Sequence, residues 1–138
     1  MKRYIDNILA ALLGLLFIMS GIVVLFNLVK APPPPEGSPA AMFMGAFAST
    51  GYLTFIKVLE VIGGVLVAIP RTRNLGLLVL GPIIVNILAF HIFITNGEGI
   101  LGIPLGIALV SLYLLWVERH AFAALVARDR TGKFTNAP

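Results

Sequence analysis

Four polar side chains stand inside long apolar stretches of this sequence and are its best candidates for chemistry: Lys57, Glu60, Asn86 and His91. A charged side chain at the centre of a membrane-spanning helix costs about 2.5–3.5 kcal/mol on insertion scales, so each such residue is a functional candidate. Lys57 and Glu60 are three residues apart, about 60° around a helix, so their charged groups can meet. A carboxyl group in hydrocarbon must be paired or protonated, and a histidine in a span can relay protons. Glu60 and His91 are therefore the candidate proton-handling residues, and all four are candidate ligand-binding residues.

The depths of these side chains match in pairs if the two apolar stretches form antiparallel helices. At a rise of 1.5 Å per residue, Lys57 lies about 8 Å and Glu60 about 12 Å below the outer end of their helix. On the next helix, His91 lies about 6 Å and Asn86 about 14 Å below the outer end. We therefore expect a polar cluster in the outer half of the bilayer. Asn86 and His91 are about 140° apart around their helix, so we expect Asn86 to face the cluster and His91 to contact another helix or the interface.

Each of the four residues also has a purely structural interpretation. The Lys57 side chain can extend outward to the interface and leave Glu60 held by Asn86, or the Lys57–Glu60 pair can serve only to specify packing. Asn86 can be a hydrogen-bonding contact between helices. His91, near the interface, can simply bond a loop carbonyl.

The composition of the chain excludes most soluble classes of protein. Of its 138 residues, 59% are hydrophobic and 12% charged, against roughly 45–50% and about 25% in ordinary globular domains. The mean hydropathy is +1.00, which excludes a disordered chain. The ten Lys and Arg residues are scattered between apolar blocks, so no nucleic-acid partner is expected. With no cysteine and two histidines, we expect no disulfide, thiol nucleophile or metal site.

Four apolar stretches have about the length of 20 residues that a membrane-spanning helix needs: 8–29, 52–69, 75–95 and 100–117. Unbroken runs of this length favour helices over the alternating strands of a barrel. The predicted fold is therefore all-α, a single domain over 1–138 that forms a four-transmembrane-helix bundle. The first stretch follows two basic residues, as in a signal peptide, but its 22 residues exceed the usual 7–15 and no clear cleavage site follows. We expect it to remain as a span.

Positive charges orient the predicted spans. Alternating spans place eight basic residues on one side: Lys2, Arg3, Arg71, Arg73, Arg119, Arg128, Arg130 and Lys133. The opposite side receives only Lys30. Positive charge marks the cytoplasmic side, so both termini are expected there. The basic tail, 119–138, is expected to anchor on anionic lipid headgroups.

The segment between the first two spans is predicted to hold a short outer helix. The four prolines 32–35 favour an extended polyproline conformation. Ser38 followed by Pro39 is typical of a helix N-cap and first helical position. The resulting helix, 39–50, is too short to span the bilayer, so we expect it to lie at the outer interface. It can be a lid packed over the bundle or a gate over a cavity.

Two glycines four residues apart, Gly102 and Gly106, form a small-residue motif in the fourth span. Such a motif lets helices approach closely, either within one bundle or between two copies of the chain. A homo-oligomer through this face is therefore one of the candidate assemblies, beside the lipid bilayer itself.

Two further segments carry a family likeness. Residues 57–64 (KVLEVIGG) and 81–91 (GPIIVNILAFH) resemble the DoxX and DoxX-like family of small bacterial integral membrane proteins. The likeness extends to 17–21 (FIMSG) in the first span and to 44–46 and 50–52 before the second. It covers nearly the whole chain. Val24 stands where a lysine is often found in the family, and cysteine is absent, so sulfur redox chemistry would need a partner or a bound cofactor.

The resemblance implies a bacterial inner-membrane protein linked to redox metabolism. The family takes its name from a subunit of a thiosulfate:quinone oxidoreductase, and some relatives resemble membrane partners of redox enzymes. It implies an accessory or quinone-interacting subunit, with a quinone as candidate cofactor, a redox enzyme as candidate partner, and Lys57, Glu60, Asn86 and His91 as the positions carried over. The chain holds no complete catalytic set, so whether it is itself an enzyme stays open. The alternatives are a non-enzymatic membrane scaffold or assembly partner and, ranked last, a small-solute or proton carrier.

Overall fold

The computed structural model describes residues 2–127, which are helical or irregular and contain no β-strand. The helices are α1 (Lys2–Leu25), α2 (Pro39–Ser49), α3 (Tyr52–Ala68), α4 (Arg73–Ala89), α5 (Ile103–Val117) and α6 (Arg119–Val126). A π-helical turn, η1 (Phe90–Ile94), continues α4. The predicted all-α class is confirmed. The tail residues Arg128, Arg130 and Lys133, predicted to bind lipid headgroups, lie outside the described residues.

The first span is displaced toward the N-terminus relative to the predicted 8–29. It ends at Leu25 because Asn27 adopts a left-handed conformation, with φ of 51°. The amide of Leu28 then donates to the carbonyl of Val23 at 2.9 Å, and that of Asn27 to Val24 at 3.2 Å. This pair of bonds is the Schellman motif, in which asparagine can replace the usual glycine. The predicted end at residue 29 was therefore wrong.

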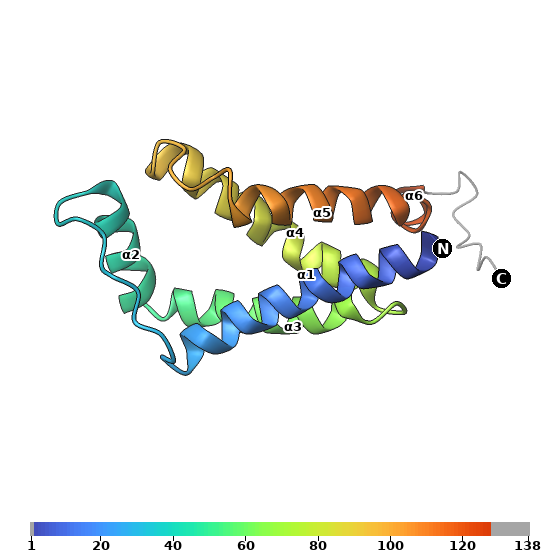
Figure 1. The fold of residues 1–138 in the computed structure, drawn as a ribbon, viewed down its shortest axis with the longest axis horizontal. Coiled ribbons are helices and arrows are strands. Elements are labelled where there is room, and N and C mark those ends of the chain that lie inside the picture. The colour runs from blue at the N-terminus through green and yellow to red at the C-terminus, as the bar shows by residue number, and fades with distance from the viewer. Residues whose placement is uncertain (1, 128–138) are drawn as a thin grey trace.

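The short outer helix forms as its cap predicted. The Ser38 side chain accepts a hydrogen bond from the Ala41 amide at 3.1 Å, and Pro39 opens the helix. Helix α2 ends at Ser49, and Gly51, with φ of 79°, turns the chain into α3. The axes of α2 and α3 differ by 80°, so α2 lies across the end of the bundle (Figure 1).

The last span begins later than the predicted residue 100. Residues 95–102 form turns instead, with positive φ at Asn96, Gly97 and Gly99. Helix α5 starts at Ile103, with Pro104 in its first turn, where the missing amide hydrogen of proline breaks no helical bond. After Val117 the chain bends by 70° into α6, a helix within the segment predicted only as a basic tail.

Helix α1 runs beside α3, which packs in turn against α4, and α5 contacts both α4 and α1 (Figure 1). The N-terminus, the α3–α4 turn and α6 lie at one end of the molecule, whereas α2 and the η1–α5 loop lie at the other. We call these the basic end and the α2 end. The helices therefore alternate in direction, as the predicted bundle requires.

Large apolar side chains occupy both the interior and the surface. The most deeply buried are Phe17, Val67, Leu80 and Leu114. Many others on α1, α3, α4 and α5 are more than half exposed, for example Leu12, Phe55, Val85, Leu109 and Leu112. An apolar surface of this extent marks contact with lipid or with another protein.

Two helical segments, Arg3–Leu25 and Arg73–Ile94, are long and apolar enough to cross a membrane, and the number rises to four if each bent pair counts as one span. Helix α3 has 17 residues and α5 has 15, or about 26 and 22 Å at 1.5 Å per residue, against a hydrocarbon core of about 30 Å. The described part of the chain is thus all-helical, with two to four candidate membrane spans.

Candidate functional site

The charged pair predicted in the second span is present, with Glu60 buried and Lys57 half-buried. Lys57 Nζ lies 2.9 Å from Oε1 and 2.8 Å from Oε2 of Glu60, one helical turn away. The Glu60 side chain is 3% exposed and that of Lys57 is 16% exposed. Because little of either side chain is exposed, the attraction between the two charges is stronger than at a protein surface. Of the alternatives open at the sequence level, the structure therefore selects the Lys57–Glu60 pair over an outward-extended lysine.

Helix α1 closes this pair with a residue that sequence analysis missed. Ser20 Oγ donates to Glu60 Oε2 at 3.0 Å and accepts from Lys57 Nζ at 3.0 Å. We call this arrangement the Ser20–Lys57–Glu60 cluster. The signal in the sequence was a serine beside Gly21 in the otherwise apolar stretch 8–25 of α1, since small residues allow the close approach that an interhelical hydrogen bond needs.

Glycines on both helices bring the α1 and α3 backbones together. A Cβ added at Gly21 would lie 2.9 Å from the carbonyl oxygen of Lys57. Two turns earlier on α1, a Cβ at Gly14 would overlap the carbonyl oxygen of Gly64. Two small residues of α3, Gly64 and Ala68, thus pack against Gly14 of α1.

The cluster is closed and neutral. An ammonium group has three N–H donors, and Lys57 directs them to Ser20 and to both carboxylate oxygens of Glu60. The charges cancel within the pair. No N–H donor of the Lys57 ammonium is left to orient a ligand. The geometry therefore favours a role in joining α1 to α3.

The predicted convergence of Asn86 on this cluster is wrong. Asn86 is exposed, and none of the side-chain hydrogen bonds among residues 2–127 includes it. The rotation of α4 explains the error, because Ile83 and Ile84 are buried and Ile87 packs against the core. Asn86 lies about 100° around the helix from Ile87, and its side chain is exposed.

His91 also lies apart from the cluster. Its Nδ1 donates to the carbonyl oxygen of Ile87 at 2.7 Å, and its ring contacts that of Phe90 edge-on, with centroids 5.6 Å apart. The structural interpretation of His91 as a donor to a carbonyl is correct, although the acceptor belongs to its own helix and not to a loop. Of the four predicted site residues, the structure brings together only Lys57 and Glu60.

Aromatic rings fasten α2 over the α2 end. Phe43 of α2 contacts Phe90 of η1, with ring centroids 5.2 Å apart, and Phe47 contacts Tyr52 of α3 at 5.1 Å. Helix α2 therefore bridges two of the elements below it. This packing fits the interpretation of α2 as a lid over the bundle.

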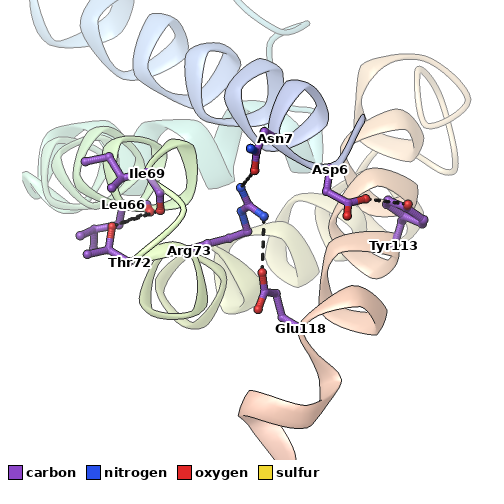
Figure 2. A network of polar contacts seen from close by, with 8 residues as sticks. All are labelled: Asp6, Asn7, Leu66, Ile69, Thr72, Arg73, Tyr113 and Glu118. Atoms are coloured by element: carbon purple, nitrogen blue, oxygen red, sulfur yellow. Dashed lines mark hydrogen bonds and ion pairs between the residues drawn. The ribbon is translucent and has the colours of Figure 1, made fainter. Parts of the chain in front are cut away.

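A second polar site lies at the basic end, around Arg73. The Arg73 side chain is 5% exposed. Its Nη2 donates to Asn7 Oδ1 of α1 at 2.7 Å, and Nη1 to Oε1 of Glu118, just after α5, at 3.4 Å. Figure 2 shows the guanidinium group between these two partners. Its Nε is buried without a hydrogen-bond partner among the described residues.

The α3–α4 turn sets the position of Arg73. Thr72 Oγ1 donates to the carbonyl oxygen of Leu66 at 2.9 Å and thereby satisfies the end of α3 (Figure 2). Arg73 is the first residue of α4 and is held inward, whereas its neighbour Arg71 is exposed. Sequence analysis placed both arginines at this end but treated them only as charges that set orientation.

The two sides of this site are joined by a third contact. Tyr113 of α5 donates through its hydroxyl to Asp6 Oδ1 of α1 at 2.8 Å. Asp6 is 9% exposed. Together with Arg73, Asp6 connects α1, α4 and α5 at the basic end.

A pocket of about 620 Å³ opens beside these side chains. Its polar lining consists of Arg3, Asp6, Asn7, Arg73 and Glu118. Within the described part of the chain, no three His, Asp or Glu side chains lie close enough together to hold a metal ion. The residues of the pocket suit a charged organic group better, since they present two guanidinium groups and two carboxylates.

Comparison with known proteins gives one relative that bears on identity. No family model matches the chain, and no solved structure matches it. Over 111 residues the chain is 31% identical to the uncharacterized protein YwoB of Bacillus subtilis strain 168, and the match covers 78% of this chain and 71% of YwoB. This chain belongs to the family of YwoB.

Proposed function

We propose that this chain is a DoxX-like accessory subunit of membrane redox metabolism, without a catalytic cycle of its own. The observation that carries the proposal is the Ser20–Lys57–Glu60 cluster. It joins residues 17–21 of α1 to residues 57–64 of α3, and both segments carry the DoxX resemblance. The groups of the cluster satisfy one another's hydrogen bonds, so its role is to hold α1 and α3 together. In this proposal electron transfer takes place in the partner enzyme.

A quinone, the cofactor that the resemblance implies, does not fit the cluster as it stands. The ammonium group of Lys57 already donates to Ser20 and Glu60, so a quinone carbonyl finds no free N–H there. His91 Nδ1 is likewise occupied by the carbonyl of Ile87. The proposal therefore routes no step through a quinone bound to these residues.

The accessory role is tested by complementation with a neutral cluster. A strain that lacks the chain is complemented with the wild-type gene or with the double variant Lys57→Met/Glu60→Met, and quinone reduction is measured in membrane vesicles with a panel of electron donors. We expect loss of one activity without the chain and equal rescue by both genes. Unchanged rates without the chain contradict the accessory role. Rescue by the wild type alone favours proton or quinone chemistry at the cluster instead.

The proposed topology has four spans with both termini on the cytoplasmic side of the bacterial inner membrane. The four spans are then α1, α3, α4 with η1, and α5, whereas α2 and α6 bend away from α3 and α5 by 80° and 70°. The basic end, defined by its elements in Figure 1, holds Arg3, Arg71, Arg73 and Arg119. Lys30 lies in the segment that joins α1 to α2. This distribution supports a cytoplasmic basic end.

The absence of cysteine from the chain allows single-cysteine labelling of each turn in intact cells. Four spans predict that Glu98→Cys, in the η1–α5 loop, reacts with a membrane-impermeant maleimide from outside. Arg71→Cys, in the α3–α4 turn, should react only after the membrane is permeabilised. Both positions are exposed, so burial does not limit the reaction. A chain in which only α1 and α4 cross the membrane gives the reverse pattern, which contradicts the four-span topology.

A further inference from the structure

The pocket at the basic end presents a buried cation with unused hydrogen-bond donors. An arginine has five N–H donors. Arg73 makes one short bond, 2.7 Å to Asn7, and one long bond, 3.4 Å to Glu118. Its Nε has no partner, although the side chain is only 5% exposed. Because buried donors are nearly always satisfied in native proteins, this guanidinium has capacity for an acceptor that the chain itself does not supply.

The charges around the pocket identify the kind of acceptor. Arg3 and Arg73 are cationic, and Asp6 and Glu118 are anionic, so the lining as a whole is neutral. A simple anion on the guanidinium groups would lie beside two carboxylates. A group that carries a phosphate and an ammonium together satisfies both halves, since guanidinium groups bind phosphate oxygens and carboxylates accept from an ammonium.

A separate apolar groove lies between α1 and α5, farther along both helices from this pocket. It has a volume of about 200 Å³ and is lined by Leu9, Leu12, Leu13 and Leu16 of α1 and by Ile103, Gly106, Ile107 and Val110 of α5. The groove begins one turn beyond the Asp6–Tyr113 hydrogen bond, because Leu9 follows Asp6 and Val110 precedes Tyr113 by three residues. Over Leu9–Leu16 it is about 10 Å long. A polar pocket with an apolar groove about one turn away on the same helices is complementary to an amphipathic molecule.

Gly106 forms part of the groove wall and leaves it open. A Cβ added at this position would meet no atom within 4 Å. Within a bilayer the neighbouring molecules with a polar head and a long apolar chain are lipids. In the proposed topology the basic end lies where lipid headgroups meet the protein, and basic pockets between membrane helices on the cytoplasmic side hold lipid headgroups.

We propose that the α1–α5 surface binds one aminophospholipid, with its phosphate at Arg73 and Arg3, its ammonium at Asp6 and Glu118, and an acyl chain in the Leu9–Leu16 groove. The site itself does not depend on the proposed function; only the assignment of the lipid to the inner leaflet rests on the proposed topology.

Native mass spectrometry of the purified full chain in detergent tests this site. We expect dioleoyl-phosphatidylethanolamine to remain bound in preference to dioleoyl-phosphatidylcholine, whose trimethylammonium group has no N–H to donate. Arg3→Gln, an exposed lining residue, should weaken binding about tenfold, the effect of losing one charge-assisted hydrogen bond. Arg71→Gln is the matched control, because it removes the same charge from an exposed residue outside the pocket lining.

The groove has its own pair of variants. Gly106→Leu should reduce lipid binding by filling the groove, whereas Gly81→Leu, also at a glycine with open space but on α4, should leave it unchanged. Equal retention of the two lipids, or equal effects of Arg3→Gln and Arg71→Gln, overturns the proposal. If free phosphoethanolamine competes with the lipid and Gly106→Leu does not alter that competition, the pocket binds a soluble ligand. If the chain forms dimers that Gly106→Leu disperses, a second copy occupies the groove. Either result also overturns the proposal. Lipid binding is measured in detergent, so its outcome depends neither on the orientation of the chain in a membrane nor on the proposed redox role.

Discussion

Glu60→Leu is expected to destabilise the folded protein by about 3–5 kcal/mol, the usual effect of removing one partner of a buried ion pair. The substitution leaves the Lys57 ammonium with Ser20 as its remaining partner, in a position where only 16% of the side chain is exposed. An unpaired charge in such surroundings has lost its hydration without compensation. The free energy of unfolding is measured by SDS titration in mixed micelles, followed by far-UV circular dichroism.

The control for this substitution is Glu98→Leu. Glu98 is an exposed carboxylate in the η1–α5 loop, so the same change of side chain should alter stability by no more than about 0.5 kcal/mol. Equal small effects of the two substitutions would show that the carboxylate of Glu60 is not buried against Lys57 in the folded protein.

Gly14→Ala is the second substitution expected to have a large effect. The added Cβ would overlap the Gly64 carbonyl oxygen and lie 2.9 Å from Ala68 Cβ. Since the first of these obstacles is backbone, α1 and α3 must move apart, and overpacking of this kind costs about 1–3 kcal/mol. The separation would also lengthen the hydrogen bonds from Ser20 to Glu60 and Lys57.

Gly106→Ala provides the matched comparison for Gly14→Ala. Both glycines lie within helices, but a Cβ at Gly106 meets no atom within 4 Å. There the higher helix propensity of alanine should stabilise the protein by up to about 1 kcal/mol. Opposite signs for the two variants, measured by the same SDS titration, are the expected result. Equal stabilisation would contradict the close approach of α1 and α3.

The parts of the fold that local rules determine were predictable from the sequence. The serine–proline pair placed the start of α2, as the bond from Ala41 to Ser38 shows. The spacing of Lys57 and Glu60 predicted their contact, because a helix brings residues three apart together. The boundaries that failed depend on single turn residues, such as Asn27 with its left-handed backbone.

Contacts between helices were harder to predict, because depth in a bilayer does not fix the rotation of a helix. Asn86 was matched to Glu60 by depth alone, yet its helix turns it to the exposed surface. Ser20 was not predicted because serine is only weakly polar and its hydrogen-bond partners, Lys57 and Glu60, lie 37 and 40 residues away in the sequence. Arg73 was correctly placed at the basic end, but its burial depends on Asn7 and Glu118, which come from opposite ends of the chain.

The central claim, that Lys57 and Glu60 form one closed unit inside the bundle, is tested most directly by their coupling free energy. The unfolding free energies of wild type, Lys57→Met, Glu60→Leu and the combined variant form a double-mutant cycle. Removing both charges of a buried pair is often neutral or stabilising, whereas removing one is costly. The account predicts that the combined variant is more stable than either single variant, with a coupling of at least about 2 kcal/mol. Additive effects, with a coupling near zero, would contradict it.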